Sequence, residues 1–147
     1  MATKKVIEEG LEFIPKFDDN GLIPVIAQDA KTGQVLMAAY MNRQALDLTI
    51  KTGYAVYFSR SRQKLWKKGE ESGHTQKVKQ ILVDCDQDCL ILKVSVDAGQ
   101  CHAGYKSCFY RALKTRLGGA SRSTKGSTKE LKFVEKKAFN PEKIYKK

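Results

Sequence analysis

Ligand side chains of two chemical kinds are concentrated in one stretch of this 147-residue chain, between residues 84 and 108. Thiolates are soft ligands that suit zinc, whereas carboxylates are hard ligands that suit Mg²⁺. The stretch holds three aspartates at alternate positions, one of the two histidines and all four cysteines, namely Asp84, Asp86, Asp88, His102, Cys85, Cys89, Cys101 and Cys108. This pattern predicts a two-metal site that the rest of the chain must position.

The three aspartates lie where two strands are predicted to turn. Because residues 86–88 form a tight connection, Asp84, Asp86 and Asp88 are expected to surround the tip of a hairpin. Mg²⁺ prefers carboxylates and keeps several of its waters, so this cluster suits it. The alternative is a polar hairpin tip without a metal, because Asp is common in turns.

Cys85, Cys101 and Cys108 are the candidate zinc ligands. No two cysteines have Cys-x-x-Cys spacing, which disfavours a compact zinc finger. Three ligands from separate segments leave a fourth position open, as in catalytic zinc sites, where the pKa of the bound water falls to about 7. Cys89 is assigned to the core of the returning strand. A disulfide is the alternative, and a reducing compartment disfavours it.

Two histidines are candidates for proton transfer, because imidazole titrates near neutral pH. His102 directly follows Cys101, and it could serve as a fourth ligand, a general base or a structural histidine. His74 is the second candidate.

A basic segment, residues 59–74, precedes the ligand-rich stretch. Arginine forks match phosphate oxygens, lysine adds positive charge, and glycine lets backbone N–H groups approach an anion. The segment fits neither a Walker loop nor a dinucleotide fingerprint. We interpret it as a phosphate-binding loop; the alternative is a solvated basic loop. Its candidate substrate-binding residues are Arg60, Arg62, Trp66, Lys68 and Ser72.

Turn signals and hydrophobic patterns predict an α+β fold, a mostly antiparallel β-sheet with one or two covering helices. Asn42 is predicted to cap a helix over residues 43–51, and Gly53 to end it. Pro15 limits a short helix over residues 6–13. Pro24 indicates a strand start or an edge strand. Strands are predicted over residues 22–28, 34–41, 54–58, 75–85 (with Val78, Ile81 and Val83 buried), 89–96, 107–113 and 131–134.

The basic charge of the chain is concentrated in its C-terminal part. The net charge is +11, but residues 112–147 hold 11 Lys and Arg against 3 Asp and Glu. We therefore expect a catalytic domain over residues 1–113 and a basic, partly flexible extension over residues 114–147. Because the surplus lies outside the ligand-rich stretch, nucleic acid is not the expected partner. No long apolar run or signal sequence is present, which predicts a cytoplasmic protein without a membrane partner.

Four motifs, in this order, resemble phosphoribosyl-AMP cyclohydrolase, an enzyme of histidine biosynthesis. The resemblance covers roughly residues 21–113, and the order of four motifs is more specific than any one of them. The motifs are Ser59-Arg60-Ser61-Arg62, then Leu65-Trp66-x-Lys68-Gly69-Glu70-x-Ser72-Gly73-His74-x-Gln76, then Asp84-Cys85-Asp86-x-Asp88, then Cys101-His102-x-Gly104-x-x-Ser107-Cys108-Phe109-Tyr110.

The resemblance implies a hydrolase whose zinc-activated water opens the adenine ring of 1-(5-phosphoribosyl)-AMP at its N1–C6 bond. It implies an intertwined homodimer that holds Zn²⁺ between Cys85 of one chain and Cys101 and Cys108 of the other. Mg²⁺ would bind Asp84, Asp86 and Asp88. His102 and His74 would be the catalytic residues, and the substrate a small-molecule nucleotide. Arg60, Arg62 and Lys68 would hold phosphates, and Trp66 would stack on the purine.

The chain departs from the family pattern at two positions, one within the aspartate motif and one directly after it. Gln87 stands where relatives often have glycine, which would alter the hairpin tip, and Cys89 is a cysteine that the pattern does not require. Some relatives carry a fused pyrophosphohydrolase domain, and the 34 residues after Leu113 are too few for one. We therefore expect the cyclohydrolase alone.

Two other functions are weighed against this one. An RNA-binding protein would use the aromatic strand over residues 54–58 and the basic tail, with salt-dependent affinity. A structural zinc protein would unfold when zinc is removed. A cyclohydrolase would instead lose turnover while keeping at least part of its fold.

Overall fold

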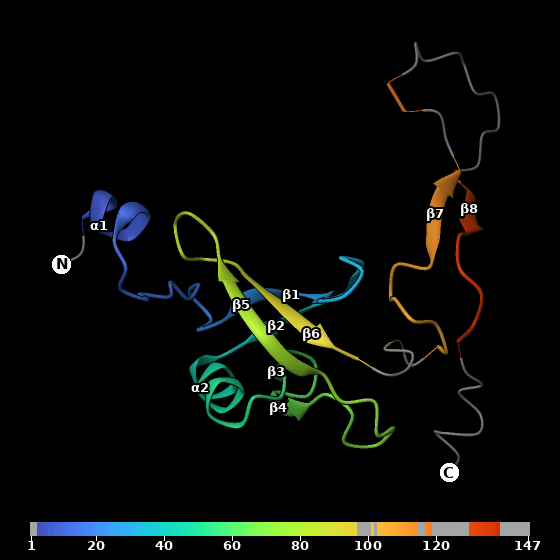
Figure 1. Cartoon of the computed structure of the whole chain (residues 1–147), viewed down its shortest axis with the longest axis horizontal. Helices are drawn as coiled ribbons and strands as arrows, with labels where there is room; N and C mark the ends of the chain where they lie inside the picture. Colours follow the sequence, from blue (N-terminus) through green and yellow to red (C-terminus); the bar gives the residue numbers. More distant parts are fainter. Residues whose placement is uncertain (1–2, 97–100, 102, 115–116, 119–129, 139–147) are drawn as a thin grey trace.

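The chain forms an α+β fold in which one sheet positions both candidate metal loops (Figure 1). The computed structural model describes residues 3–96, 101, 103–114, 117–118 and 130–138. In this part of the chain there are two helices and eight strands, and most strand pairs are antiparallel. The predicted fold class is confirmed.

The main sheet has four strands in the order β2-β1-β6-β5. A turn at Gly33 joins β1 and β2 into the predicted antiparallel hairpin, and β5 and β6 form a second hairpin. The two hairpins meet at a parallel pairing of β1 with β6, from Val25 opposite Leu90 to Asp29 opposite Val94. The strands are β1 (Ile23–Asp29), β2 (Val35–Met41), β5 (Lys77–Val83) and β6 (Leu90–Ser95).

Helix α2 (Arg43–Thr52) begins and ends as its capping residues predict. The Asn42 side chain accepts the N–H of Ala45 at 2.8 Å, which satisfies one of the donors that a helix start leaves open. Gly53 ends the helix at φ 79°, a left-handed conformation that glycine adopts without steric cost. Ala45, Leu46 and Thr49 are buried, so this face of α2 covers the core.

The core lies at the centre of the sheet because its inner strands alternate strictly. In β1 every second residue from Ile23 to Asp29 is buried, and in β6 Leu90, Leu92 and Val94 are buried. Pro24 lies at the second position of an inner strand, before the pairing with β6 begins at Val25. Its missing N–H therefore interrupts no bond of that ladder.

Strand β5 is an edge strand and none of its residues is fully buried. The prediction of burial is wrong for Val83, which is 40% exposed, and holds only in part for Val78 and Ile81, which are half-buried. An alternating pattern fixes which residues share a face, but the position of the strand in the sheet decides whether that face is covered.

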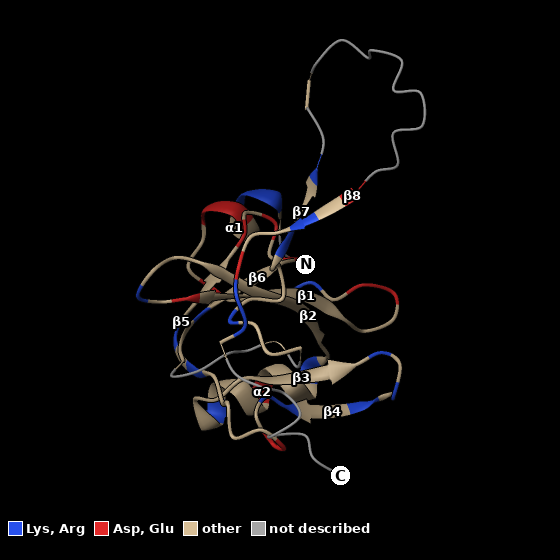
Figure 2. Ribbon diagram, turned by 90° about the vertical axis from the view of Figure 1, so that its right-hand side faces the viewer, with Lys and Arg blue, Asp and Glu red and all other residues tan. Residues whose placement is uncertain are grey.

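Two further predictions need correction. The first helix is α1 (Lys4–Glu9) and not residues 6–13; the Thr3 side chain caps it, and it ends at Gly10, well before Pro15. The basic segment is not all loop, because β4 (Lys64–Lys67) pairs with β3 (Val56–Ser59) in an antiparallel hairpin. This hairpin carries Arg60 and Arg62 at its tip, and Lys and Arg residues cluster in this part of the ribbon (Figure 2).

The C-terminal region contributes a strand, as its apolar residues predict. Strand β8 (Glu130–Phe133) pairs with β7 (Arg111–Lys114) at the end of the molecule opposite α1 (Figure 1). Most of the predicted basic extension lies outside the described residues, namely 115–116, 119–129 and 139–147. No helix in the described part of the chain is long and apolar enough to cross a membrane.

Candidate active site and metal centres

The two groups of candidate ligands lie at opposite ends of β6. Residues 84–89 (the aspartate loop) precede this strand at the α1 end of the sheet, and Cys101 with residues 103–108 (the cysteine loop) follows it at the β7 end (Figure 1). A strand of six residues spans roughly 17–20 Å. The ligand-rich stretch that is continuous in sequence is therefore divided in space.

The aspartate loop brings the three predicted hard ligands together. One carboxylate oxygen from each of Asp84, Asp86 and Asp88 lies within 4.8 Å of the others. The loop is held from inside, because the Asp84 side chain accepts the N–H groups of Asp88 at 2.9 Å and Cys89 at 3.1 Å. Among the described residues this is the one group of three or more potential metal ligands.

Close contact among the three carboxyls shows in the pKa values of Asp88 and Asp84. Hydrogen bonding to Asp86 and Asp84, together with their negative charges, raises the pKa of Asp88 to about 6. The largest effect on Asp84 is partial burial, which raises its pKa, but hydrogen bonds from the Asp88 side chain and from two backbone N–H groups outweigh it and lower the pKa. A divalent cation would offset the negative charges of these carboxyls, so the donor set fits Mg²⁺.

The cysteine loop brings together two of the three predicted zinc ligands. Burial, and the charge and hydrogen bonding of the nearby Cys101 thiol, raise the pKa of Cys108 to about 12. The Cys101 side chain also accepts the N–H of Ala103 at 3.4 Å. Two adjacent sulfur atoms fit a soft divalent metal, because thiolate sulfur is a ligand that such metals prefer.

Polar contacts fix the cysteine loop to the start of β2. The Ser107 hydroxyl donates to the carbonyl of Val35 at 2.8 Å, and the Cys108 N–H donates to the carbonyl of Leu36 at 2.7 Å. Lys106 forms a 2.8 Å ion pair with Asp29, the last residue of β1. Although burial opposes it, this pairing and further hydrogen bonds lower the pKa of Asp29.

The C-terminal segment supports the same loop from its other side. The carboxylate of Glu135 accepts the Ser107 N–H at 3.4 Å and a hydrogen bond from the Gln34 side chain. Tyr110 stacks on Tyr105 with ring centroids 3.8 Å apart, and Phe133 of β8 lies against both rings. Residues that follow the predicted catalytic domain therefore help to hold its cysteines.

A cavity of about 510 Å³ opens beside Cys108. Its size lies within the roughly 300–1,000 Å³ that is typical of ligand pockets. The β3–β4 hairpin and the segment that follows it supply most of the wall, with Met37 and Cys108 at the sheet. The lining residues with side chains of possible chemical use are Ser59, Ser61, Arg62, Lys64, Trp66, Lys68, Glu70, Glu71, Ser72 and Cys108.

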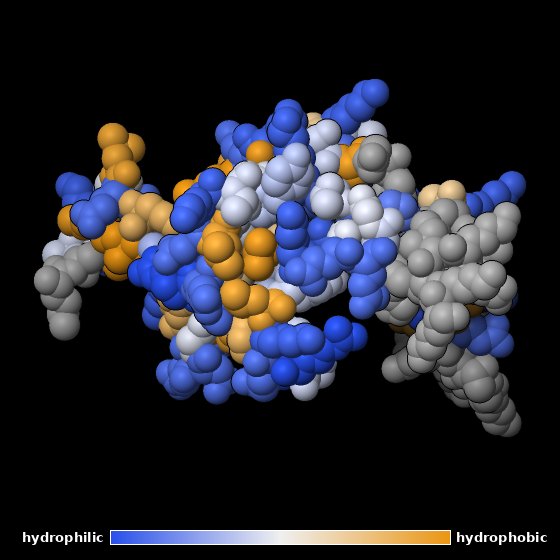
Figure 3. Space-filling view, turned by 90° about the horizontal axis from the view of Figure 1, so that it is seen from below, coloured by the Kyte–Doolittle hydropathy of each residue, from blue (hydrophilic) through white to orange (hydrophobic). Residues whose placement is uncertain are grey.

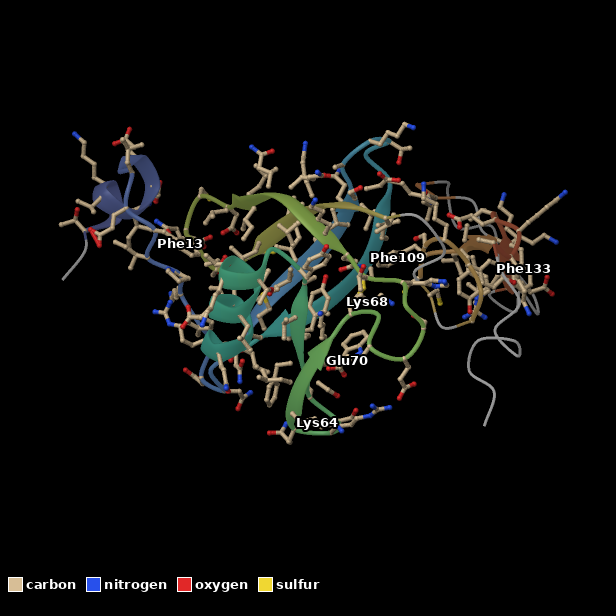
Figure 4. The ribbon with its side chains drawn as sticks, turned by 60° about the horizontal axis from the view of Figure 1, so that its bottom comes forward. Phe13, Lys64, Lys68, Glu70, Phe109 and Phe133 are labelled. Atoms are coloured by element: carbon tan, nitrogen blue, oxygen red, sulfur yellow. The ribbon has the colours of Figure 1, made fainter. Side chains whose placement is uncertain are left out.

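Lys68 is the one buried lysine in the described part of the chain, and it connects this cavity with the thiols. Its residue is only 6% exposed, and its side chain points inward near Phe109, whereas Lys64 points outward (Figure 4). Burial lowers the pKa of Lys68, and the neighbouring sulfur atoms of Cys108 and Cys101 partly oppose this effect. The Lys68 amine is thus held beside the sulfur pair.

The backbone around Gly69 makes this placement possible. Gly69 adopts φ 91°, and a Cβ atom there would lie 2.5 Å from the backbone nitrogen of Thr75. Only glycine allows the chain to pass so close to itself. The tight turn fixes Lys68, whose N–H donates to the carbonyl of Ala55 at 3.1 Å.

An aromatic pair forms the floor beneath Lys68. The rings of Tyr57 and Trp66 lie 5.6 Å apart, and the Lys68 ammonium lies 5.6 Å from the Trp66 ring centroid. Tyr57 is buried and donates to the Gln76 side chain at 2.5 Å, which holds the pair in place. Trp66 is therefore positioned to offer a flat face to a ligand in the cavity.

The remaining predicted residues are dispersed. The Arg60 guanidinium lies 4.1 Å from the Tyr40 ring centroid, outside the lining of the cavity. His74 is half-buried in the turn after Gly69, and its backbone N–H donates to the Ser72 hydroxyl at 3.1 Å. His102 lies outside the described residues. Cys89 is half-buried at the start of β6, and burial raises the pKa of its thiol.

Cys85 does not join Cys101 and Cys108 within one chain. It is exposed beside a groove of about 520 Å³ between the N-terminal segment and β5, at the other end of the sheet. The described residues contain no cluster of three ligands that includes it.

Two side chains that sequence reasoning left without a role emerge as structural supports. Gln87 bonds to the N-terminal segment and Glu135 to the cysteine loop, in each case across more than 25 residues of sequence. Glu70 and Glu71 also line the cavity. Glu70 belongs to one of the four motifs, but neither residue was predicted to be part of the site. No local pattern signals contacts of such long range.

Comparison with known proteins identifies the relatives of this chain. The sequence model of the phosphoribosyl-AMP cyclohydrolase family matches residues 37–110. A phosphoribosyl-AMP cyclohydrolase of Methanococcoides burtonii is 64% identical over 104 residues, which cover 71% of this chain and 86% of that protein. Those of Methanospirillum hungatei (53% identical; 90% and 88% covered) and Bordetella petrii (55% identical; 88% and 91% covered) are similar over more of the chain. The chain therefore belongs to the phosphoribosyl-AMP cyclohydrolase family.

Proposed function

We propose that this protein hydrolyses the N1–C6 bond of the adenine ring of 1-(5-phosphoribosyl)-AMP, a step of histidine biosynthesis. The observation that carries the proposal is the composition of the cavity. Its lining combines the Cys108 thiol, which has Cys101 beside it, with buried Lys68, the Trp66 ring and the basic side chains of Arg62 and Lys64. These features suit a purine that carries phosphates.

Cys101 and Cys108 of one subunit and Cys85 of the partner subunit would hold Zn²⁺. The support is the separation of Cys85 from the other two thiols along β6, because a zinc ion needs its ligands within about 2.3 Å. A symmetric homodimer in which each aspartate end meets the cysteine end of the other chain would complete two identical sites. The exposed edge strand β5 and the groove beside Cys85 leave room for that contact.

Bound zinc would supply a water of lowered pKa as the nucleophile. The water oxygen would add to C6, the N1–C6 bond would break, and N1 would leave with a proton, so that C6 becomes the carbon of a carboxamide. Substitution at N1 leaves the ring electron-poor, which favours the addition. Lys68, fixed beside the thiols, would stabilise the negative charge of the oxygen that adds to C6.

The rest of the cavity would bind and orient the substrate. Trp66 would stack on the purine, Arg62 and Lys64 would contact phosphate, and Ser72 would donate a hydrogen bond. Arg60 would contribute from the tip of the hairpin once it leaves Tyr40. Because the phosphates are charged and the base is flat, these two kinds of contact fix both ends of the ligand.

Proton transfer would fall to His102, which follows Cys101 directly, with His74 as the second candidate. Asp84, Asp86 and Asp88 would hold Mg²⁺, and their supply of three clustered carboxylates is the support for this assignment. Mg²⁺ held there would supply positive charge for the substrate phosphates, which would give the aspartate loop a role in binding.

The decisive experiment is a turnover assay with 1-(5-phosphoribosyl)-AMP, followed by the appearance of the ring-opened carboxamide. We expect turnover by the wild type with zinc and Mg²⁺ present, and none by Cys101→Ser. Cys89→Ser is the matched control, because Cys89 lies at the start of β6 and should leave both zinc content and turnover intact. Absence of turnover by the wild type, with both metals bound, would refute the proposal.

A further inference from the structure

We propose that Gln87 is a positioning residue that locks the N-terminal arm (residues 7–16) onto the aspartate loop and thereby holds the loop in its cation-binding shape. The inference deepens the proposed function, because its cation component rests on the Mg²⁺ site suggested above. The locking of the arm is a separate claim with its own measurement.

The Gln87 side chain uses both ends of its amide on the arm. Its oxygen accepts the N–H of Ile14 at 2.7 Å, and its nitrogen donates to the carbonyls of Ile7 at 3.1 Å and Glu12 at 3.2 Å. The residue is only 5% exposed although it lies at the tip of a hairpin. A buried amide with all of these bonds satisfied fixes its neighbours firmly, because breaking any of them leaves a polar group without water.

The backbone of Gln87 adds a fourth contact. Its carbonyl accepts the N–H of Lys16 at 2.7 Å, and its own N–H donates to the carbonyl of Asp84 at 3.1 Å. One residue therefore bonds the arm at several points and the first ligand of the loop. Because Gln87 stands between Asp86 and Asp88, displacing it would move the carboxylates on both sides.

The backbone of Gln87 has an unfavourable conformation, whose cost the hydrogen bonds of its side chain must offset. Gln87 adopts φ 59°, in the left-handed region that glycine occupies without cost and other residues rarely adopt. Glycine at this position would form the same turn more easily but could not reach the arm. Gln87 therefore adopts a less favourable backbone conformation than glycine would, but its side chain connects two segments more than 70 residues apart.

The arm also lines the groove beside the exposed Cys85. Ile7, Leu11 and Phe13 of the arm line the groove that Cys85 and Gln87 also line. Hydrophobic side chains gather at this end of the molecule (Figure 3), and Phe13 points from the arm toward the sheet (Figure 4). Order in the arm and cation binding by the loop should therefore favour each other, as two linked equilibria must.

Hydrogen exchange of the Lys16 amide measures the lock directly. In Gln87→Met the side-chain bonds are lost, but the Gln87 carbonyl that accepts the Lys16 N–H remains. Faster exchange at Lys16 therefore reports release of the arm and not removal of its acceptor. We expect exchange at least about tenfold faster in Gln87→Met, and likewise in Gln87→Gly, which keeps the turn and guards against a misfolded loop.

The matched control is Gln63→Met. Gln63 is also a glutamine at positive φ, 52°, but it is exposed and its side chain donates to the Arg60 carbonyl within its own turn. This change should leave the exchange of Lys16 unaltered. Unchanged exchange in both Gln87 variants would overturn the lock.

Cation binding to the full-length protein, measured with Mn²⁺ by electron paramagnetic resonance and with Mg²⁺ by calorimetry, tests the positioning. Residues behind a ligand typically alter metal affinity about 10–100-fold, and we expect a loss of this size in Gln87→Met. Added Mg²⁺ should also slow the exchange of Lys16 in the wild type and have a much smaller effect in the variant, a response that a purely structural contact would not give.

The outcomes separate the two claims. A wild type that binds no divalent cation would overturn the Mg²⁺ site of the proposed function, and with it the positioning role, whereas faster exchange in Gln87→Met would still establish the lock. Normal cation affinity in Gln87→Met despite a released arm would overturn the positioning role alone.

Discussion

The aspartate loop and the cysteine loop lie at the two ends of β6, and the protein holds them in different ways. The aspartate loop is a turn within one hairpin, exposed at its carboxylates and fastened by Gln87 to the N-terminal arm. The cysteine loop is fastened by Ser107, Lys106 and Glu135 to two strands and to the C-terminal segment. Asp84 and Asp86 are exposed to water, whereas in the cysteine loop Cys101 is buried and only Cys108 is exposed.

This difference follows from the chemistry that each loop is proposed to serve. Mg²⁺ keeps most of its hydration, so carboxylates at an exposed turn suffice. A zinc-bound water reacts in a site from which bulk water is excluded, so its ligands need a fixed and partly buried support. In both cases a terminal segment, distant in sequence, provides the support.

The largest effect is expected from mixing inactive subunits, which tests whether the two loops of different chains form one zinc site. If each zinc site takes Cys85 from one chain and Cys101 and Cys108 from the other, Cys85→Ser and Cys108→Ser should each be inactive. After exchange of subunits between the two variants, one site in each mixed dimer is intact, and about a quarter of the wild-type turnover should return.

The control for this experiment is a mixture of Cys101→Ser with Cys108→Ser. Both changes affect the same end of the chain, so every site in the mixed dimer lacks one ligand and no turnover should return. Equal recovery in the two mixtures would contradict a site shared between subunits.

The next largest effect concerns the cysteine loop, where zinc affinity should depend on pH. The pKa of Cys108 is raised to about 12, so its thiol is protonated at neutral pH and zinc must displace that proton. Zinc affinity, measured by competition with a chelator, should therefore rise with pH, by up to about tenfold per pH unit for each proton released.

Lys68 sharpens this prediction, because its positive charge lowers the pKa of Cys108. Lys68→Met should weaken zinc binding at every pH between 6 and 8. Lys67→Met is the matched control, since Lys67 lies 5.5 Å from the Tyr54 ring centroid and outside the cavity lining. A zinc affinity that does not change with pH would show that the thiols ionise before the metal binds.

Removal of the Glu135 carboxylate should have a smaller effect. Glu135→Ala leaves the Ser107 N–H and the Gln34 amide without their acceptor, which should lower the free energy of unfolding by about 1–3 kcal/mol. Zinc affinity should fall about 10–100-fold while Mg²⁺ affinity stays the same. The neighbouring exposed Lys136, changed to alanine, is the control. Equal losses for both metals would mean that the two loops are not supported separately.

Loss of the α2 cap should have the smallest effect. Asn42→Ala removes the acceptor of the Ala45 N–H, which should lower the free energy of unfolding in urea by about 0.5–2 kcal/mol. Because α2 lines neither the cavity nor the cysteine loop, the turnover number should not change. A marked fall in turnover would connect α2 to the site by a route absent from the described contacts.

Local chemistry made much of the fold predictable. Asn42 and Gly53 delimit α2 because capping depends on a few neighbouring residues, and the β1–β2 hairpin follows from two apolar runs around a glycine turn. Strand β4 was missed because four residues with lysine at both ends give no periodic signal. Val83 is exposed because a strand pattern does not reveal whether a sheet ends beside it.

In the candidate site, too, contacts within a short segment could be predicted from the sequence, whereas contacts between distant segments could not. Residue type and spacing predicted the aspartate cluster and the proximity of Cys101 to Cys108, since each group lies within one short segment. The burial of Lys68 could not be predicted, because it depends on the close passage of Gly69 past His74 and Thr75. The supports at Gln87 and Glu135 depend on tertiary contacts that no local pattern encodes.

The parallel pairing of β1 with β6 has a consequence for the order of events on the ribosome. About sixty residues separate these strands. The nascent chain can therefore form the β1–β2 hairpin early, but β1 can pair with β6 only after β6 has been synthesised. The aspartate loop is synthesised just before that strand, and the cysteine loop just after it. The pairing of β1 with β6 can therefore precede the emergence of Cys101 and Cys108, so that the last ligands meet a scaffold that is already in place.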